Sequence, residues 1–239
     1  MNNLDLEIKL LRGRPITIEG IGKLHPLTLE EIQRIGEVEY NKYIFVATLK
    51  QENLRIEGKT LSSFETTQVY LYSDESYRKL FLESLSLFFK EQVYYHQPTG
   101  LCYLGSLEQP RIIEEQAYDE TIQVIEAQNF INKKSNDEEF KPHDDHARQL
   151  VDKLKVYRKK VEEINHENGL NLFDIISIVS SHSPNINLFT VWDLTVYQLY
   201  TIYIRLMMKD HYESQYYLLP HVTDSRLLNL AHWATKIKK

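Results

Sequence analysis

The sequence contains few of the residues that cross-link a chain or bend it sharply. Its 239 residues include one cysteine, Cys102, with 8 glycines and 7 prolines. A lone cysteine excludes an internal disulfide and a thiolate zinc site, and it is compatible with a reducing compartment. Because Leu101 and Tyr103 flank Cys102 in a strand-like segment, we expect the thiol to pack as a small buried hydrophobic group.

Long apolar runs are missing as well. A membrane-spanning helix needs about 18 consecutive apolar residues, and no stretch of this sequence reaches that length. Residues 1–9 carry acidic side chains and no apolar core, so we expect no signal peptide. The protein is therefore expected to stay in the cytoplasm where it is made, without a membrane partner.

The sequence contains fewer basic than acidic residues. The sequence has 28 lysines and arginines against 34 aspartates and glutamates, which gives a formal net charge of −6. A broad electrostatic attraction to nucleic acid is therefore absent, and we expect no nucleic-acid partner. One local basic face lies within residues 153–160 of a predicted helix, directly before a glutamate-rich stretch. We interpret it as a solvated helix face, with an acidic partner or nucleic acid as the alternative.

Recognisable catalytic motifs are also lacking. Residues 20–23 contain two glycines and a lysine without the spacing of a phosphate-binding loop, so they predict a turn. His143 and His146 have a spacing that could hold a metal, with two aspartates between them. Because this cluster lies in a polar stretch near a helix start, capping is the preferred interpretation. We expect no enzymatic activity and no cofactor; a metal-dependent enzyme using these histidines is a remote alternative.

The first part of the chain shows mixed strand and helix patterns. Alternating apolar residues within 5–27 predict a short β region, carried by Leu6, Ile8, Leu10, Ile16 and Ile18. Thr28 and Glu31 form a capping box that predicts a helix over 29–49. Residues 50–73 are ambiguous between strands and irregular segments, with strand candidates at 54–56 and 69–72.

The next segment gives the clearest local signals. A helix capped by Ser73 or Asp74 is predicted to run to Phe89 and to pack through one face, formed by Tyr77, Leu80, Phe81, Leu85 and Phe88. Residues 93–96 and 101–104 then predict a hairpin around a Pro- and Gly-containing turn. A third strand at 111–113 and a helix over 118–128 complete this unit.

The later part of the chain is predicted to be helical. Residues 132–146 are the most polar stretch and are interpreted as a linker. They divide the chain into an α+β domain, 1–131, and a helical domain, 147–239. The second domain is predicted to contain a heptad-patterned helix over 147–164 and helices over 172–180, 191–217 and 227–233. The predicted fold class is α+β and predominantly α-helical, with short strands and a hairpin near the N-terminus and a C-terminal helical bundle.

Two regions, 93–130 and 186–233, carry a resemblance to a known family. The most specific string is Trp192-Asp-Leu-Thr-Val-Tyr-Gln-Leu-Tyr200, and Ala231-His-Trp233 follows near the end. In the first region the string Val124-Ile-Glu-Ala-Gln-Asn129 contributes. Together they resemble tail assembly chaperones of tailed bacteriophages that infect Gram-positive hosts. The resemblance covers about a third of the chain.

The resemblance implies a binding role rather than catalysis. Chaperones of this family coat the phage tape measure protein in the host cytoplasm until tail tube subunits polymerise around it. The implied partners are the tape measure protein, the tail tube protein and further copies of the chain. A structural tail-tip or baseplate protein is the alternative. The candidate binding residues are Trp192, Tyr197, Tyr200, Tyr203, Met207 and Trp233. Their helical spacing favours a buried stripe over a contact surface.

Overall fold

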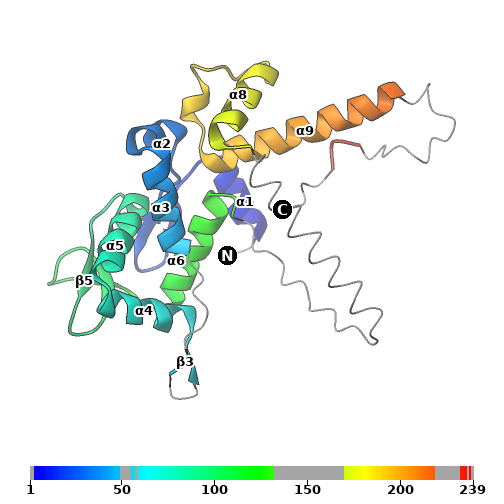
Figure 1. The fold of residues 1–239 in the computed structure, drawn as a ribbon. Helices are drawn as coiled ribbons and strands as arrows, with labels where there is room; N and C mark the ends of the chain where they lie inside the picture. Colours follow the sequence, from blue (N-terminus) through cyan, green and yellow to red (C-terminus); the bar gives the residue numbers. More distant parts are fainter. Residues whose placement is uncertain are drawn as a thin grey trace, which may run out of the picture.

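The computed structural model of the chain describes residues 3–48, 55–56, 59–131, 170–218, 232–235 and 237. Helices dominate this part of the chain, and they are accompanied by three small antiparallel sheets. The predicted α+β, predominantly helical class is confirmed. The longest of the described helices, α9 (Val196–Leu218), extends away from the others (Figure 1). Among the described residues, no helix combines the length and the apolar character that crossing a membrane requires.

The chain begins with helix α1 (Asn3–Leu11), so the strand predicted for Leu6, Ile8 and Leu10 is wrong. Leu10 is buried and Leu6 is partly buried, four residues away on the same helical face, whereas Ile8 is 57% exposed. The buried residues Leu6 and Leu10 therefore follow a helical period, and the alternation of apolar and polar residues in this segment does not reflect a strand. The strand predicted at Ile16 and Ile18 is confirmed as β1 (Ile16–Ile18), which pairs with β2 (Gly22–Leu24).

The helix predicted over 29–49 is divided into α2 (Leu29–Ile35) and α3 (Glu37–Thr48). The predicted capping box is present: Thr28 Oγ1 accepts a hydrogen bond from the Glu31 amide, and the Glu31 carboxylate accepts one from the Thr28 amide. Gly36 separates the two helices with a φ of 91°, a backbone conformation that only glycine adopts readily. Gly36 therefore ends α2 and lets α3 start in a new direction.

Of the two strand candidates within residues 50–73, one is wrong and one is confirmed. The strand candidate at 69–72 lies inside helix α4 (Ser63–Ser73), which starts at a capping box formed by Ser62 and Glu65. The strand candidate at 54–56 is represented by β3 (Arg55–Ile56), which pairs with β4 (Lys59–Thr60). Asp74 caps α5 (Glu75–Phe89) as predicted. The predicted inner face of α5 is buried at Phe81, Leu85 and Phe88.

The predicted hairpin unit agrees with the structure. Strands β5 (Val93–His96), β6 (Leu101–Leu104) and β7 (Arg111–Ile113) form an antiparallel sheet in that order. Helix α6 (Glu115–Gln128) follows, starting at Glu115 rather than at Tyr118. Cys102 lies buried on β6, and this burial raises the pKa of its thiol to about 12. The expected burial of this thiol is therefore confirmed.

The described C-terminal part contains α8 (Leu172–His182), a short 3₁₀ helix η1 (Val191–Asp193) and α9. The predicted helix over 191–217 starts later because Thr195 and Gln198 form a reciprocal cap. Their backbone amides and side chains bond each other at the first turn of α9. The linker 132–146, the heptad helix 147–164 and both histidines of the candidate metal site lie outside the described residues, as does most of the helix predicted over 227–233.

One hydrophobic core connects the early and late parts of the chain. Leu199 of α9 and Val191 of η1 are fully buried in the same cluster as Leu10 of α1. Backbone contacts support this packing, because the Leu29 amide donates to the Leu194 carbonyl at 2.8 Å. The division predicted at 132–146 stays a prediction. The described residues on its two sides nevertheless share a core.

Candidate interaction site

The structure places the predicted aromatic residues in three different settings. Tyr197 is buried, with its ring centroid 5.3 Å from that of Phe130, and Tyr200 lies 5.6 Å from the same ring. Both therefore fasten the start of α9 to the end of α6. Tyr203 and Met207 are half-buried further along α9. Tyr197 and Tyr200 thus hold the start of α9 in place, and the rest of the helix is half-buried or exposed.

Trp192, in contrast, supports a tight turn at residues 187–190. Its indole Nε1 donates to the Leu188 carbonyl at 2.8 Å. Asn187 Oδ1 accepts from the amides of Phe189 and Thr190, at 2.9 and 3.2 Å. The Asn187 amide donates to Thr190 Oγ1 at 3.1 Å, which closes the turn from the other side. These contacts fix the backbone of the turn.

The turn presents two large apolar side chains to solvent. Phe189 is 91% exposed and Leu188 is 61% exposed. Neither residue was among the predicted binding residues. The available signal was the Asn187-x-x-Thr190 spacing, since asparagine and threonine side chains often bond the backbone of turns. Two apolar residues inside such a turn indicate a rigid loop whose hydrophobic side chains have no partner within the described chain.

Trp233 is held against α9 through backbone and ring contacts. Arg205 Nη1 donates to the carbonyl oxygens of Trp233 and Thr235, each at 2.7 Å. The His232 ring lies 5.0 Å from the Tyr212 ring in an edge-on arrangement. Residues 232–235 therefore lie along the middle of α9. The sequence pattern did not predict this contact, which joins positions far apart in the chain.

Chemistry-bearing groups do not form an evident catalytic constellation in the described residues. No group of three or more histidines, cysteines, aspartates or glutamates there could hold a metal ion. Burial raises the pKa of Tyr118, whose hydroxyl lies 2.8 Å from Thr67 Oγ1, and burial also raises the pKa of Tyr40. These hydroxyls stay protonated and act as packed hydrogen-bonding groups.

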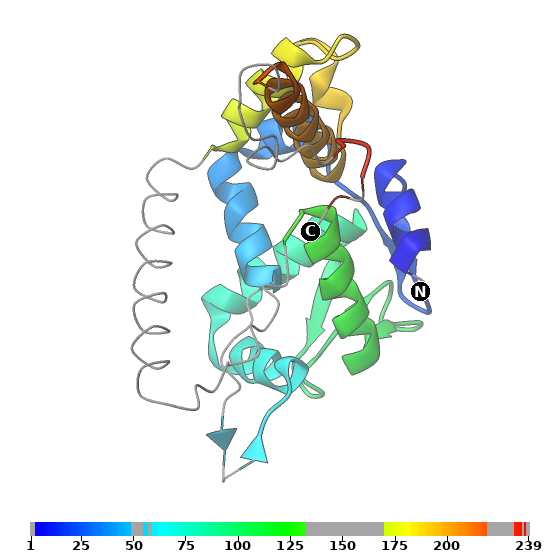
Figure 2. The ribbon, with the colours of Figure 1, turned by 90° about the vertical axis from the view of Figure 1, so that its right-hand side faces the viewer.

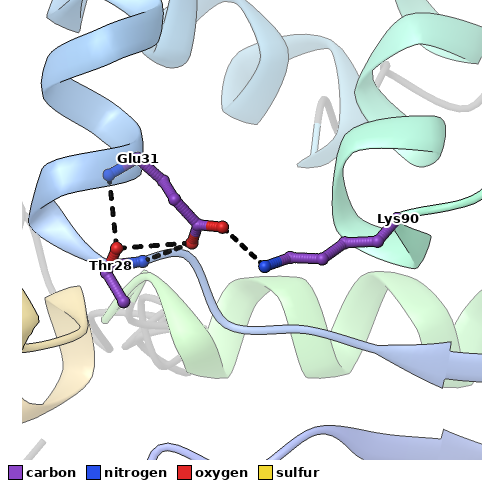
Figure 3. Close-up of polar contacts among 3 residues, drawn as sticks. All are labelled: Thr28, Glu31 and Lys90. Carbon is purple, nitrogen blue, oxygen red and sulfur yellow. Dashed lines mark hydrogen bonds and ion pairs between the residues drawn. The ribbon is translucent and has the colours of Figure 1, made fainter.

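A second surface feature is an open cleft of about 630 Å³, here called the basic cleft. Its cationic lining residues are Arg12, Arg14, Arg34 and Lys90. Lys90 Nζ contacts Glu31 Oε1 at 2.5 Å, and Glu31 Oε2 accepts from the Thr28 amide at 2.9 Å (Figure 3). One carboxylate thus completes the α2 cap and ties α2 to the end of α5.

This arrangement lowers the pKa of Glu31. Partial burial by itself raises the pKa, but the hydrogen bonds from Lys90 and from the Thr28 backbone outweigh it. His25, which also lines the cleft, has its pKa lowered by partial burial and then by the charge of Lys90. At neutral pH the His25 ring is therefore neutral, and the positive charge of the cleft comes from arginine and lysine.

Replacing Lys90 with methionine is expected to reduce stability more at neutral pH than in acid. A carboxylate with a lowered folded pKa stabilises the fold above its unfolded pKa, and this contribution is lost as pH falls through the folded value. Because both side chains are partly exposed, the loss at neutral pH should be about 1 kcal/mol or less. Urea unfolding at neutral pH and at a pH well below the usual glutamate pKa of 4.5, where the folded-state carboxylate is also protonated, measures this difference.

Lys209→Met is the matched control, since Lys209 pairs with Glu213 at 3.7 Å on the exposed side of α9. It should change stability less than Lys90→Met at neutral pH, because its carboxylate partner caps no helix. An equal stability loss in both variants, independent of pH, would contradict the role given to Glu31.

The later part of the chain is thus helical and has several exposed aromatic side chains. Residues 159–238 match the family model described as the YomV second domain, a phage-associated domain. The match covers α8, η1, α9 and residues 232–235 among the described elements, and it supports a phage origin. No curated protein and no solved structure matches the chain.

Proposed function

We propose that this chain is a non-enzymatic tail assembly chaperone that binds the phage tape measure protein in the host cytoplasm. The observation that carries the proposal is the hydrogen-bonded turn at 187–190, which leaves Phe189 almost fully exposed. This turn lies inside the region that matches a phage-associated domain. The sequence resemblance to tail assembly chaperones supports the same role.

Exposing large aromatic side chains to water is unfavourable unless a partner covers them. Phe173 and Tyr217, like Phe189, are large and strongly exposed, and all three lie within residues 170–218. A large apolar side chain that a fixed backbone holds out in solvent is a candidate contact for a protein partner. An aromatic side chain on a fixed backbone loses little conformational entropy on binding, so it serves as an anchor. A long helical partner such as a tape measure protein offers apolar faces for such anchors.

Co-expression with the tape measure protein of the same phage tests the proposal. We expect the tape measure protein to become soluble and to co-purify with several copies of this chain, since a coat depends on many contacts along one partner. A tape measure protein that stays insoluble contradicts the proposal. Finding the chain in mature particles would instead support the alternative of a structural tail-tip or baseplate protein.

A further inference from the structure

The basic cleft carries more positive than negative charge, although the whole chain is acidic. Glu30 and Glu31 pair with Arg34 and Lys90 respectively, so these cations are compensated. The charges of Arg12 and Arg14, which also line the cleft, are not neutralised by such an ion pair. Both arginines are exposed, and within the described part of the chain neither side chain has a carboxylate partner. The cleft therefore offers two arginines to an acidic ligand.

An acidic groove lies elsewhere on the same molecule, between α1 and α6. Figures 1 and 2 both show these two helices side by side. The groove has a volume of about 900 Å³, and its lining includes Leu6, Glu114, Glu115 and Glu120. No lysine or arginine is among the described residues that line it. Its field is therefore negative, opposite to that of the basic cleft.

Helix α1 contributes to both surfaces. Leu6 lines the acidic groove, and Arg12 follows the end of the same helix into the basic cleft. With a rise of 1.5 Å per residue, α1 is only about 13 Å long. Ile8 and Leu11, at 57% and 54% exposed, share the outer face of this helix, on the side away from Leu6. Charged and apolar contact groups are thus collected around one short helix.

We propose that the basic cleft of one copy docks on the acidic groove of a second copy of this chain, with α1 at the centre of the contact. A self-complementary surface of this kind closes a pair when each copy supplies both halves. The apolar side chains of Ile8 and Leu11 add buried area that surface ion pairs alone do not provide.

Charge complementarity favours a second copy over nucleic acid. Two uncompensated arginines neutralise only a small part of a phosphate backbone, whereas they match the local carboxylates of the acidic groove. The acidic groove, in contrast, is present at the same concentration as the cleft whenever the chain is present. The contact does not depend on the proposed chaperone function, because it involves no other protein.

Charge reversal with rescue tests the proposal on the full chain alone. The cleft variant carries Arg12→Glu and Arg14→Glu, and the groove variant carries Glu115→Lys and Glu120→Lys. Light scattering and sedimentation should give a wild-type species of twice the 28.4 kDa chain mass that dissociates as salt is added. Each variant alone should have a dissociation constant raised at least about tenfold, because like charges then face each other.

A mixture of the two variants tests whether the cleft of one copy contacts the groove of the other. Equal amounts should form a mixed pair, since the reversed cleft then meets the reversed groove with opposite charges. A misfolded variant could not be rescued in this way, and far-UV circular dichroism checks each variant separately. A wild-type chain that is monomeric at every concentration overturns the proposal. So do variants that still pair alone, or a mixture that does not pair.

Discussion

Replacing Leu199 with alanine is expected to destabilise the whole described fold, by about 2–5 kcal/mol. Leu199 lies on α9 and is fully buried in the core that also contains residues of α1 and η1. Removing its side chain leaves a cavity where the early and late parts of the chain meet. The loss should therefore appear in both parts, although they were predicted from the sequence as separate domains.

Two probes report separately on the two parts during urea unfolding. Both tryptophans, Trp192 and Trp233, belong to the late part of the chain, and Cys102 is a buried thiol in the early part. Tryptophan fluorescence and thiol labelling should give coincident transitions, shifted together by Leu199→Ala. Tyr217→Ala, a change at an exposed position of the same helix, should shift neither by more than about 0.5 kcal/mol. A transition that moves only in fluorescence would support two independent domains.

Local signals in the sequence were sufficient for elements whose ends are marked by side chains. The capping box of Thr28 and Glu31 located the start of α2, and Asp74 located the start of α5. The same pattern is present in Ser62 with Glu65 and in Thr195 with Gln198. Recognising these pairs would have placed α4 and the start of α9 correctly.

Other features depended on contacts that no local pattern contains. Leu6, Ile8 and Leu10 fit both a strand and a helix over so short a span, and only the packing of Leu10 settles the period. The exposure of Phe189 is likewise a property of the assembled surface. An apolar residue beside a predicted aromatic stripe is normally assigned to the core, so the strongest candidate anchor was missed while Tyr197, a core residue, was included.

Replacing Phe189 with serine is expected to weaken tape measure binding on the order of 30-fold, a loss typical of an aromatic hot spot. The fold should be unaffected, because the side chain is 91% exposed and its backbone amide keeps its bond to Asn187. Asn187→Ala should weaken binding less. It preserves the phenyl ring but removes the acceptor that fixes the turn, so binding then includes the entropy of ordering the loop.

Phe45→Ser provides the matched control, since Phe45 is also strongly exposed but lies on α3, outside the region that matches the phage-associated domain. Titration of purified tape measure segments with each variant, beside urea unfolding, separates binding from stability. If Phe45→Ser and Phe189→Ser weaken binding equally, general hydrophobicity is responsible rather than the turn. If Phe189→Ser binds like wild type, the partner must contact another part of the surface, with the end of α9 at Tyr216 and Tyr217 as the next exposed aromatic site.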